Sequence, residues 1–469
     1  MDVPTLTPDD LAALPPSVVA FIRWLQDRVT QLEAQNADLH ARLNQDSSNS
    51  SRPPSTDPPS YKPAPPKPPS GQPPGGQTGH PRHSRLLRTP TRIVHHTPHT
   101  CDGCGQLLMG YDPNPTRRQV VDLPVIQPDV TDHYIHRITC LLCGVVTAAP
   151  VPPEAVPTYG PRLQASLALF GGEYRMSKRS VAAFCRDYLG LPISTGQICA
   201  LEHQTSEALG PAVDAVRSYV QTRPTNVDET AWRQGNRTAW LWVAATRLVA
   251  VFAIYLSRSR ASFQDLMGRT PAPVVTTDRY SVYSHLPAGQ RQLCWAHLRR
   301  DFQAMIDRGG LGKAVGEELL KQTDAILKEW KRVRDGPLSR EEFREQLLPG
   351  LRGAFETALE SGVACGCAKT SSVCMELRHW RESLWTFASH AEVEPTNNAA
   401  ERAVRHAVCW RKTSYGTASV AGSRFVARIL TVVASCRLQG RKALEFVTES
   451  LRATRLGTPP PSLVPVGAS

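Results

Sequence analysis

Two aspartates stand where neighbouring strands could place a pair of metal ligands. Asp228 lies in "TNVDETAW" and Asp278 in "VVTTDRYSVY", each beside an apolar run typical of a strand. Two carboxylates held together repel one another unless a cation binds, and Mg²⁺ or Mn²⁺ prefers such oxygen ligands. Two of these ions could activate an attacking oxygen and stabilise a leaving one, which is the chemistry of phosphodiester transfer. Taken singly, Asp278 could instead be a turn residue and Asp228 a helix cap.

A third carboxylate would be needed to complete a two-ion site, and Glu401 is the candidate. The stretch "EPTNNAAERAVR", residues 394–405, predicts the start of a helix. In one interpretation Asn398 is the N-cap and Glu401 closes a capping box with it. In the other, Glu401 is a metal ligand. The two are compatible if the Glu401 side chain rotates away from the cap when an ion binds.

Four cysteines form a second candidate metal site, of a different kind. Two C-x2-C pairs, "CDGCG" and "CLLCG", can each point two sulfurs at one ion and together complete a tetrahedral thiolate site for a structural Zn²⁺. Four thiolates leave no open position, so catalytic zinc is disfavoured. Residues 105–139 separate the pairs by more than the usual spacing. The four ligands would be Cys101, Cys104, Cys140 and Cys143.

The composition favours a polyanionic partner. The 469 residues carry 54 Lys and Arg against 42 Asp and Glu, a net charge of +12. Nucleic acid fits this balance better than an anionic membrane, because no basic amphipathic anchor is evident. The opening "MDVPTLTPDD" lacks a secretory signal, and Arg247 interrupts the apolar run 239–256, which favours two core strands over a membrane span. We therefore expect a cytoplasmic, nucleoid-associated protein with reduced thiols.

The N-terminal part is expected to hold a coiled coil and a linker. Residues 18–45 predict a coiled-coil helix, and a single helix packed on its own protein is the alternative. Residues 46–92 predict a Pro-rich disordered linker and a basic arm, which either contacts phosphates or is simply solvated. Residues 93–155 would form the zinc-binding β module. The heptad seam consists of Leu25, Val29, Leu32, Asn36, Leu39 and Leu43.

The next region is expected to be helical. Within residues 156–222 the pattern predicts a helix, a "GLP" turn and a second helix capped by Ser194 or Thr195. This order suits a helix-turn-helix that binds DNA, although any αα-hairpin gives a similar string.

A sheet should follow and carry the two aspartates. Residues 223–308 predict three strands, a helix and two further short strands before another helix, a layout similar to ribonuclease H. There Asp228, at the end of the first strand, and Asp278, after the fourth, can lie side by side. The fold class is thus multidomain α+β. The remaining expected parts are a helical insertion (309–390), core helices that carry Glu401 (391–450) and a disordered tail (451–469).

Several blocks of this sequence occur together in one known family. They are "VDETAW", "TDRYSVY", "CWAHLRRDF" and "NNAAERAVRHAVCWRKTSYG", preceded by "LNQDSSNSSRPPSTD", the cysteine pairs and "YGPRLQASLALF…GLPIST". In these blocks and their order the chain resembles the DDE transposases of the IS66 insertion-sequence family. The resemblance implies an RNase-H-like core whose catalytic triad, Asp228, Asp278 and Glu401, binds two Mg²⁺ or Mn²⁺ ions.

The resemblance also marks residues around the triad. His297, in a C-x2-H pattern, is expected near the scissile DNA, with packing against the sheet as the alternative. Arg411 and Lys412 could hold phosphates or be ordinary surface charge. The other positions that match the family are Cys294, Asn397, Asn398 and Arg405.

The implied reaction is hydrolysis at the ends of a mobile element, followed by attack of the freed 3′-OH on target DNA. The implied partners are the element ends, target DNA, further copies of the chain and accessory proteins of the same element, with no membrane. Two rivals stay open. One is an RNase-H-like metal-dependent nuclease without strand transfer, and the other is a non-catalytic zinc-containing DNA-binding protein, which would tolerate loss of the triad.

Overall fold

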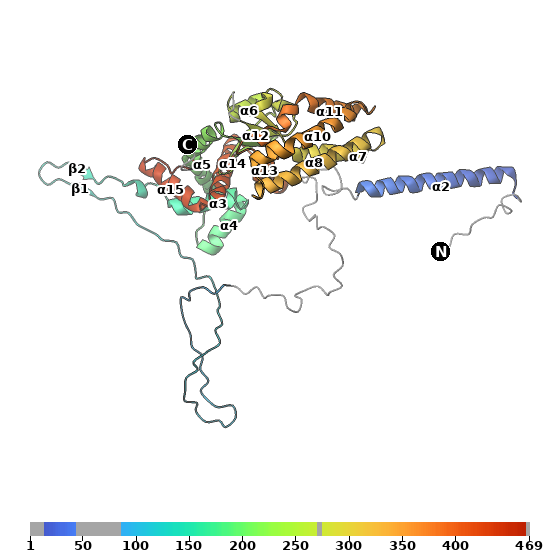
Figure 1. Cartoon of the computed structure of the whole chain (residues 1–469). Coiled ribbons are helices and arrows are strands. Elements are labelled where there is room, and N and C mark those ends of the chain that lie inside the picture. The colour runs from blue at the N-terminus through green and yellow to red at the C-terminus, as the bar shows by residue number, and fades with distance from the viewer. Residues whose placement is uncertain (1–13, 44–85, 270–273, 466–469) are drawn as a thin grey trace.

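The computed structural model describes residues 14–43, 86–269 and 274–465 of the 469-residue chain (Figure 1). Its first element is α2 (Pro16–Leu43), where the sequence predicted a helix over residues 18–45. The leucines and the valine of the seam are exposed on α2, so no described segment covers it. The coiled coil stays a prediction. Most of the expected linker, residues 46–85, lies outside the described residues.

A mixed five-stranded sheet lies at the centre of the fold. Its order is β5–β4–β3–β6–β7; the first three strands are antiparallel, and β3, β6 and β7 are parallel. This confirms the expected succession of three strands, a helix and two short strands, with the apolar run 239–256 divided between two strands. The elements are β3 (Thr225–Gln234), β4 (Arg237–Ala245), β5 (Ala250–Tyr255), α6 (Arg260–Met267), β6 (Val275–Thr277) and β7 (Arg291–Leu293).

One predicted strand boundary is wrong. The strand β3 does not end at Asp228 but continues to Gln234, because it pairs with β4 from Asn226 through Gln234. Gly235 closes this hairpin with a φ of 58°, a left-handed conformation that glycine adopts without a Cβ clash. Asp228 therefore lies within the paired part of β3, where its pairing with Val243 of β4 holds its backbone in place.

Helices from both halves of the chain cover the sheet and share one hydrophobic core with it. Hydroxyls of one helix, α14, also complete the edge strand: Ser435 accepts from the amide of Ala250 (3.1 Å) and Thr431 from that of Phe252 (3.0 Å). The expected helical region, residues 156–222, is thus packed together with the sheet. Helices α5 (Thr195–Val220), α13 (Asn398–Ser414) and α14 (Val420–Leu438) contact the strands, and α3 (Pro161–Gly172) and α15 (Ala443–Leu456) pack against α5 and α14.

The predicted helix–turn–helix pair is present. The first helix, α4 (Lys178–Leu189), ends at Gly190, which has a φ of 65°. The second, α5, is capped by Ser194, whose Oγ accepts from the amide of Gln197 at 3.1 Å. Of the two cap candidates, Ser194 is therefore the N-cap, and Thr195 is the first helical residue.

A helical subdomain follows the last strand and has a hydrophobic core of its own. Aromatic rings dominate this core, with Trp295 against Phe355 (ring centroids 4.9 Å apart) and Trp330 against Phe387 (4.8 Å). This region contains the segment that was expected to be a helical insertion. Its main helices are α7 (Trp295–Arg308), α8 (Lys313–Arg334), α10 (Leu348–Val363), α11 (Ala368–His379) and α12 (Thr386–Ser389).

The expectation of a disordered tail from residue 451 is wrong for the described residues. Helix α15 runs to Leu456, and the following segment returns to the core. Leu463 is fully buried, and its carbonyl accepts from Nε2 of Gln439 at 2.9 Å. Burial of this leucine holds the segment in place. None of the described helices combines the length and apolar character that a membrane span requires.

Candidate active site

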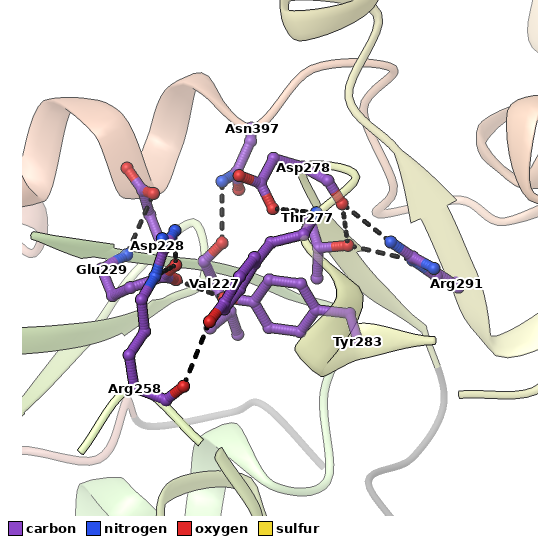
Figure 2. A network of polar contacts seen from close by, with 10 residues as sticks. Val227, Asp228, Glu229, Arg258, Thr277, Asp278, Tyr283, Arg291 and Asn397 are labelled. Carbon is purple, nitrogen blue, oxygen red and sulfur yellow. Dashed lines mark hydrogen bonds and ion pairs between the residues drawn. The ribbon is translucent and has the colours of Figure 1, made fainter. Parts of the chain in front are cut away.

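The parallel pairing of β3 with β6 brings the two aspartates together. Its register sets Thr225 opposite Val275 and Asn226 opposite Thr276. Two residues further along the same register, Asp228 falls beside Asp278, which directly follows β6. Figure 2 shows both side chains at this edge, on adjacent strands. The sequence prediction that the two aspartates lie side by side is thus what the sheet topology produces.

Asp228 is the most perturbed carboxyl group of the cluster. Burial raises its pKa well above the usual value, and repulsion from Glu229, Asp278 and Glu401 raises it further. Its Oδ1 accepts from the amide of Glu229 at 2.9 Å, while Oδ1 of Asp278 accepts from the amide of Tyr280, also at 2.9 Å. Asp278 and Glu401, from two other segments, thus lie near Asp228, although among the described residues these three carboxylates do not form a group within ligand distance.

A fourth carboxylate, Glu229, was not singled out in the sequence. Its side chain is 1 % exposed and pairs with Arg258, whose Nε donates to Oε1 at 2.7 Å. The hydroxyl of Tyr283 donates to the other oxygen, Oε2. These two partners occupy Glu229, so it is held as a neutralised neighbour of Asp228 rather than as an open ligand (Figure 2). Only its position next to Asp228 signalled it in the sequence.

Asn397 anchors the segment that precedes Glu401. Its Nδ2 donates to the carbonyl of Val227 at 2.8 Å, and its backbone amide donates to Sγ of Cys294 at 3.1 Å. From β3, Nδ2 of Asn226 donates to the carbonyl of Thr396 at 3.0 Å. The start of α13 is therefore fastened to the strand that carries Asp228, although about 170 residues separate them in sequence.

The predicted capping box is absent from α13. Asn397, not Asn398, occupies the N-cap position, and its side chain is bound to β3 instead of capping the helix. Asn398 is the first helical residue and is exposed. The Glu401 amide bonds to the carbonyl of Asn397 at 3.1 Å, so Glu401 lies in the first turn with its carboxylate free of any capping role. The capping-box interpretation of this stretch is therefore wrong, and the metal-ligand interpretation stays a prediction.

His297 and Arg300, on α7, face the Glu401 carboxylate. Nδ1 of His297 lies 3.4 Å from Oε1 of Glu401, and a terminal nitrogen of Arg300 lies 3.5 Å from the same oxygen. Burial and the neighbouring Arg300 lower the pKa of His297 to about 4, so its imidazole is neutral at neutral pH. His297 thus lies at the carboxylate cluster and does not only pack against the sheet. Arg300 was not predicted.

Cys294 completes this corner of the site. It is the N-cap residue of α7 and is 1 % exposed. Burial raises the pKa of its thiol to about 12. The thiol, one His297 ring nitrogen and one Glu401 oxygen all lie within 4.8 Å of one another. Sequence had linked Cys294 with His297, and the fold adds Glu401 to them.

The predicted basic residues lie on α13. Arg405 and Lys412 are exposed, four and eleven positions after Glu401, which places them along the same helix face as Glu401. Arg411 is half-buried on another face. A further cation, Arg291, was not predicted: it is buried, which lowers its pKa to about 10, and it donates to the carbonyl of Asp278 at 2.8 Å.

The carboxylate cluster fits a hard divalent cation. Its donors, from Asp228, Asp278 and Glu401, are all oxygens, and burial, followed by repulsion from the neighbouring carboxylates, raises the pKa of Asp228. A bound Mg²⁺ or Mn²⁺ would offset this repulsion, since such ions select carboxylate ligands. The donor chemistry suits the predicted ions, which stay a prediction because the described residues do not hold these three carboxylates as a group within ligand distance.

The four knuckle cysteines are arranged in two local turns. Gly105 donates to the carbonyl of Cys101 (2.8 Å), and Gly144 donates to that of Cys140 (2.9 Å). Both glycines have positive φ, 75° and 71°, as tight knuckle turns require. A short hairpin, β1 (Arg137–Thr139) with β2 (Val146–Ala148), flanks the second turn. Among the described residues, the group of three or more donors within ligand distance is the one at Glu401, so the four-cysteine zinc site stays a prediction.

The family model of the IS66 family transposases matches residues 158–424, which include β3, β6 and α13. The chain belongs to the IS66 transposase family. The matched part contains all three carboxylates of the cluster and the C-x2-H pair, and it leaves the knuckle cysteines outside. Residues 10–86 match a family of unknown function, DUF6444.

Two relatives from Sinorhizobium fredii (strain NBRC 101917 / NGR234) resemble this family member. The uncharacterized protein y4hP is 24% identical over 391 residues, 74% of this chain and 69% of the relative. The uncharacterized protein y4qI is 27% identical over 199 residues, 40% of this chain and 36% of the relative. The chain thus spans about a third of y4qI and about two thirds of y4hP.

Proposed function

We propose that this IS66-family transposase cleaves DNA at the ends of an insertion sequence and joins the 3′-OH ends to target DNA. The observation that carries the proposal is that the register of β3 with β6 sets Asp228 beside Asp278, while hydrogen bonds fasten the start of α13, which carries Glu401, to β3. Family membership supplies the class of reaction. The strand order supports an RNase-H-like core for this sheet.

Asp228, Asp278 and Glu401 would hold two Mg²⁺ or Mn²⁺ ions. Bound there, such ions activate an attacking oxygen and stabilise the leaving one. The protein's own part is to fix the three carboxylates before substrate arrives. Pairing within β3 holds Asp228, the amide of Tyr280 orients Asp278, and the Asn397 anchor sets the first turn of α13 against β3.

Two further groups tune the charge of the site. Arg258 and Tyr283 satisfy Glu229, so that this extra carboxylate does not compete with the three ligands. Arg300 beside Glu401 offsets part of the negative charge while no ion is bound. His297, within 3.4 Å of Glu401, is placed to contact the scissile phosphate group or its water.

The surface beside the cluster suits the DNA backbone. Arg405 and Lys412 continue from Glu401 along one face of α13, and the whole chain carries a net charge of +12. Cations on phosphates supply most of the affinity for DNA and place the strand in register. We therefore assign Arg405 and Lys412 to the phosphates next to the cleaved bond, with Arg411 and Asn398 at the margin.

Action on two element ends would require assembly, for which the exposed seam of α2 is available. Further copies of the chain, and accessory proteins of the same element, are the proposed protein partners. One structural Zn²⁺ on Cys101, Cys104, Cys140 and Cys143 would join the two knuckles. Such a protein would work in the cytoplasm, on the nucleoid.

The test is an assay of cleavage and joining on terminal-repeat DNA with Mg²⁺ or Mn²⁺. Parent protein should nick the element end and then produce joined DNA, and Asp278→Asn should abolish both products. Cleavage without joined product would identify a nuclease of the same fold. DNA binding with no cleavage under either metal would identify a non-catalytic binding protein.

A further inference from the structure

We propose that Cys294, His297 and Glu401 form a separate site for a zinc-class divalent cation, which would withdraw Glu401 from the carboxylate cluster and so inhibit cleavage. The inhibitory part rests on the proposed function, while the metal site itself does not. One ligand atom from each residue lies within 4.8 Å of the other two, a spacing that suits neighbouring ligands of one ion.

Two of the three ligand atoms are buried and make no hydrogen bond, although the Arg300 guanidinium lies 3.5 Å from one of them, Oε1 of Glu401. Nδ1 of His297 and Oε1 of Glu401 are buried atoms without a hydrogen bond, although they lie 3.4 Å apart. Buried polar atoms in folded proteins nearly always make hydrogen bonds, so two such atoms that face each other without one need an explanation. A cation between them would satisfy both at once.

The sulfur of Cys294 would fill the third position. Cys294 is the N-cap residue of α7, and the backbone amide of Asn397 donates to its Sγ at 3.1 Å. Burial outweighs this amide and raises the pKa of the Cys294 thiol to about 12, so an ion that binds here must displace the thiol proton, and the amide then stabilises the bound thiolate. His297, three positions later, lies over the same helix turn and completes a C-x2-H chelate.

The mixture of donors decides which ion would bind. Sulfur, imidazole nitrogen and carboxylate oxygen together suit Zn²⁺ and similar borderline ions, whereas Mg²⁺ prefers oxygen alone. The side chains of His297 and Glu401 are 24% and 33% exposed, which leaves a route from solvent. Three protein ligands also leave a fourth position open to water or to a DNA phosphate.

The site would act on the proposed reaction through Glu401. While Oε1 of Glu401 binds an ion beside α7, it cannot serve Asp228 and Asp278 at the sheet edge. Arg300 opposes zinc, because its guanidinium lies 3.5 Å from the same oxygen. Arg300→Gln should therefore bind zinc-class ions more tightly than the parent does.

The binding test uses Co²⁺ as a visible substitute for zinc, on the full chain in reducing buffer without DNA. Cobalt bound to a thiolate absorbs in the near ultraviolet, and its tetrahedral geometry gives visible bands. Cys294→Ser and His297→Asn should each lose one cobalt equivalent and its bands. Cys436→Ser, which alters another buried cysteine, should keep them. The same difference should appear in a Cys101→Ser background, which separates this site from the knuckles.

Equal cobalt binding by the parent, Cys294→Ser and His297→Asn would overturn the metal site. A melting curve checks each variant, and His297→Asn decides the matter if Cys294→Ser does not fold.

In Mg²⁺-dependent cleavage, micromolar Zn²⁺ should inhibit the parent at least tenfold more strongly than His297→Asn, each relative to its own zinc-free rate. Equal inhibition would overturn the zinc effect on Glu401. A parent that never cleaves would contradict the proposed function, while the cobalt result would still decide the metal site.

Discussion

The carboxylate cluster and the cysteine knuckles place their proposed metal ligands in opposite ways. The carboxylates come from distant segments, and buried hydrogen bonds such as that from Asn397 to Val227 hold those segments together without an ion. Each knuckle is instead a local turn, and the strands beside the second one are exposed. Packing thus prepares the first site, while an ion would have to assemble the second. This difference predicts which site depends on metal for its structure.

The largest effect should come from removal of a ligand in the prepared site. Asp228→Ala or Asp278→Ala should lower the cleavage rate by about a hundredfold or more, since several kcal/mol of transition-state stabilisation disappear with the ions. Binding of the element ends should change little, because it depends on cations. A strand-cleavage assay beside a DNA-binding titration checks both. Asp214→Ala, on the exposed face of α5, is the control and should cleave normally.

The next effect concerns the knuckles and should be structural. The parent should hold one Zn²⁺ that Cys140→Ser loses, as elemental analysis of freshly reduced protein would show. Chelation should expose residues 86–155 to protease while the core keeps its melting temperature. Cys374→Ser, a buried cysteine of the helical subdomain, should leave the zinc content unchanged. A parent without zinc would contradict the four-cysteine assignment.

Local patterns made much of this architecture predictable. An apolar run rich in β-branched and aromatic residues predicted β4 and β5, and the residues at the helix start predicted α5 and its Ser194 cap. Asp228 and Asp278 could be paired because a strand order was inferred. These predictions succeeded where burial and hydrogen bonding are decided within a few residues.

The tertiary contacts were not predictable in the same way. The sequence suggested a capping box for Glu401, but Asn397 bonds to β3 and leaves the helix end uncapped. Arg258 and Tyr283 neutralise Glu229 from segments 29 and 54 residues away, and no local pattern signals such a pair. The buried Leu463 appeared to belong to a tail, since a lone leucine among prolines has no periodicity.

A moderate effect should appear in the stability of the metal-free site. The raised pKa of Asp228 means that the folded protein binds more protons than the unfolded one, so stability falls as pH rises above the unfolded value of about 4. Asp228→Asn removes this cost and should raise the melting temperature of metal-free protein at neutral pH. Mg²⁺ at ten times its Kd should add about 1.4 kcal/mol to the parent.

Calorimetry with and without Mg²⁺ checks this prediction. The Asp228→Asn variant should gain less from Mg²⁺ than the parent does, and Asp214→Asn should behave like the parent. If Asp228→Asn melts lower than the parent in chelator at neutral pH, the carboxylates do not repel one another as described.

The smallest expected effect concerns self-association of the chain through the N-terminal helix α2. Leu32→Asp places a charge in the exposed seam of α2 and should weaken self-association. Thr30→Asp, off the seam on the same helix, is the matched control. Light scattering reports the mass of each. Equal masses for the parent, Leu32→Asp and Thr30→Asp would show that the seam does not join chains.

Glu401→Gln tests the central claim most directly. Glutamine keeps the size of the side chain and its place in the first turn of α13, so the melting temperature should hold, but an amide is a poor ligand for a hard cation. With Mg²⁺ and terminal-repeat DNA, cleavage should fall by about a hundredfold or more, while Arg402→Gln, one position along the helix, should cut at a rate close to that of the parent. If Glu401→Gln cuts as fast as the parent, Glu401 is not the third metal ligand and the assigned active site is wrong.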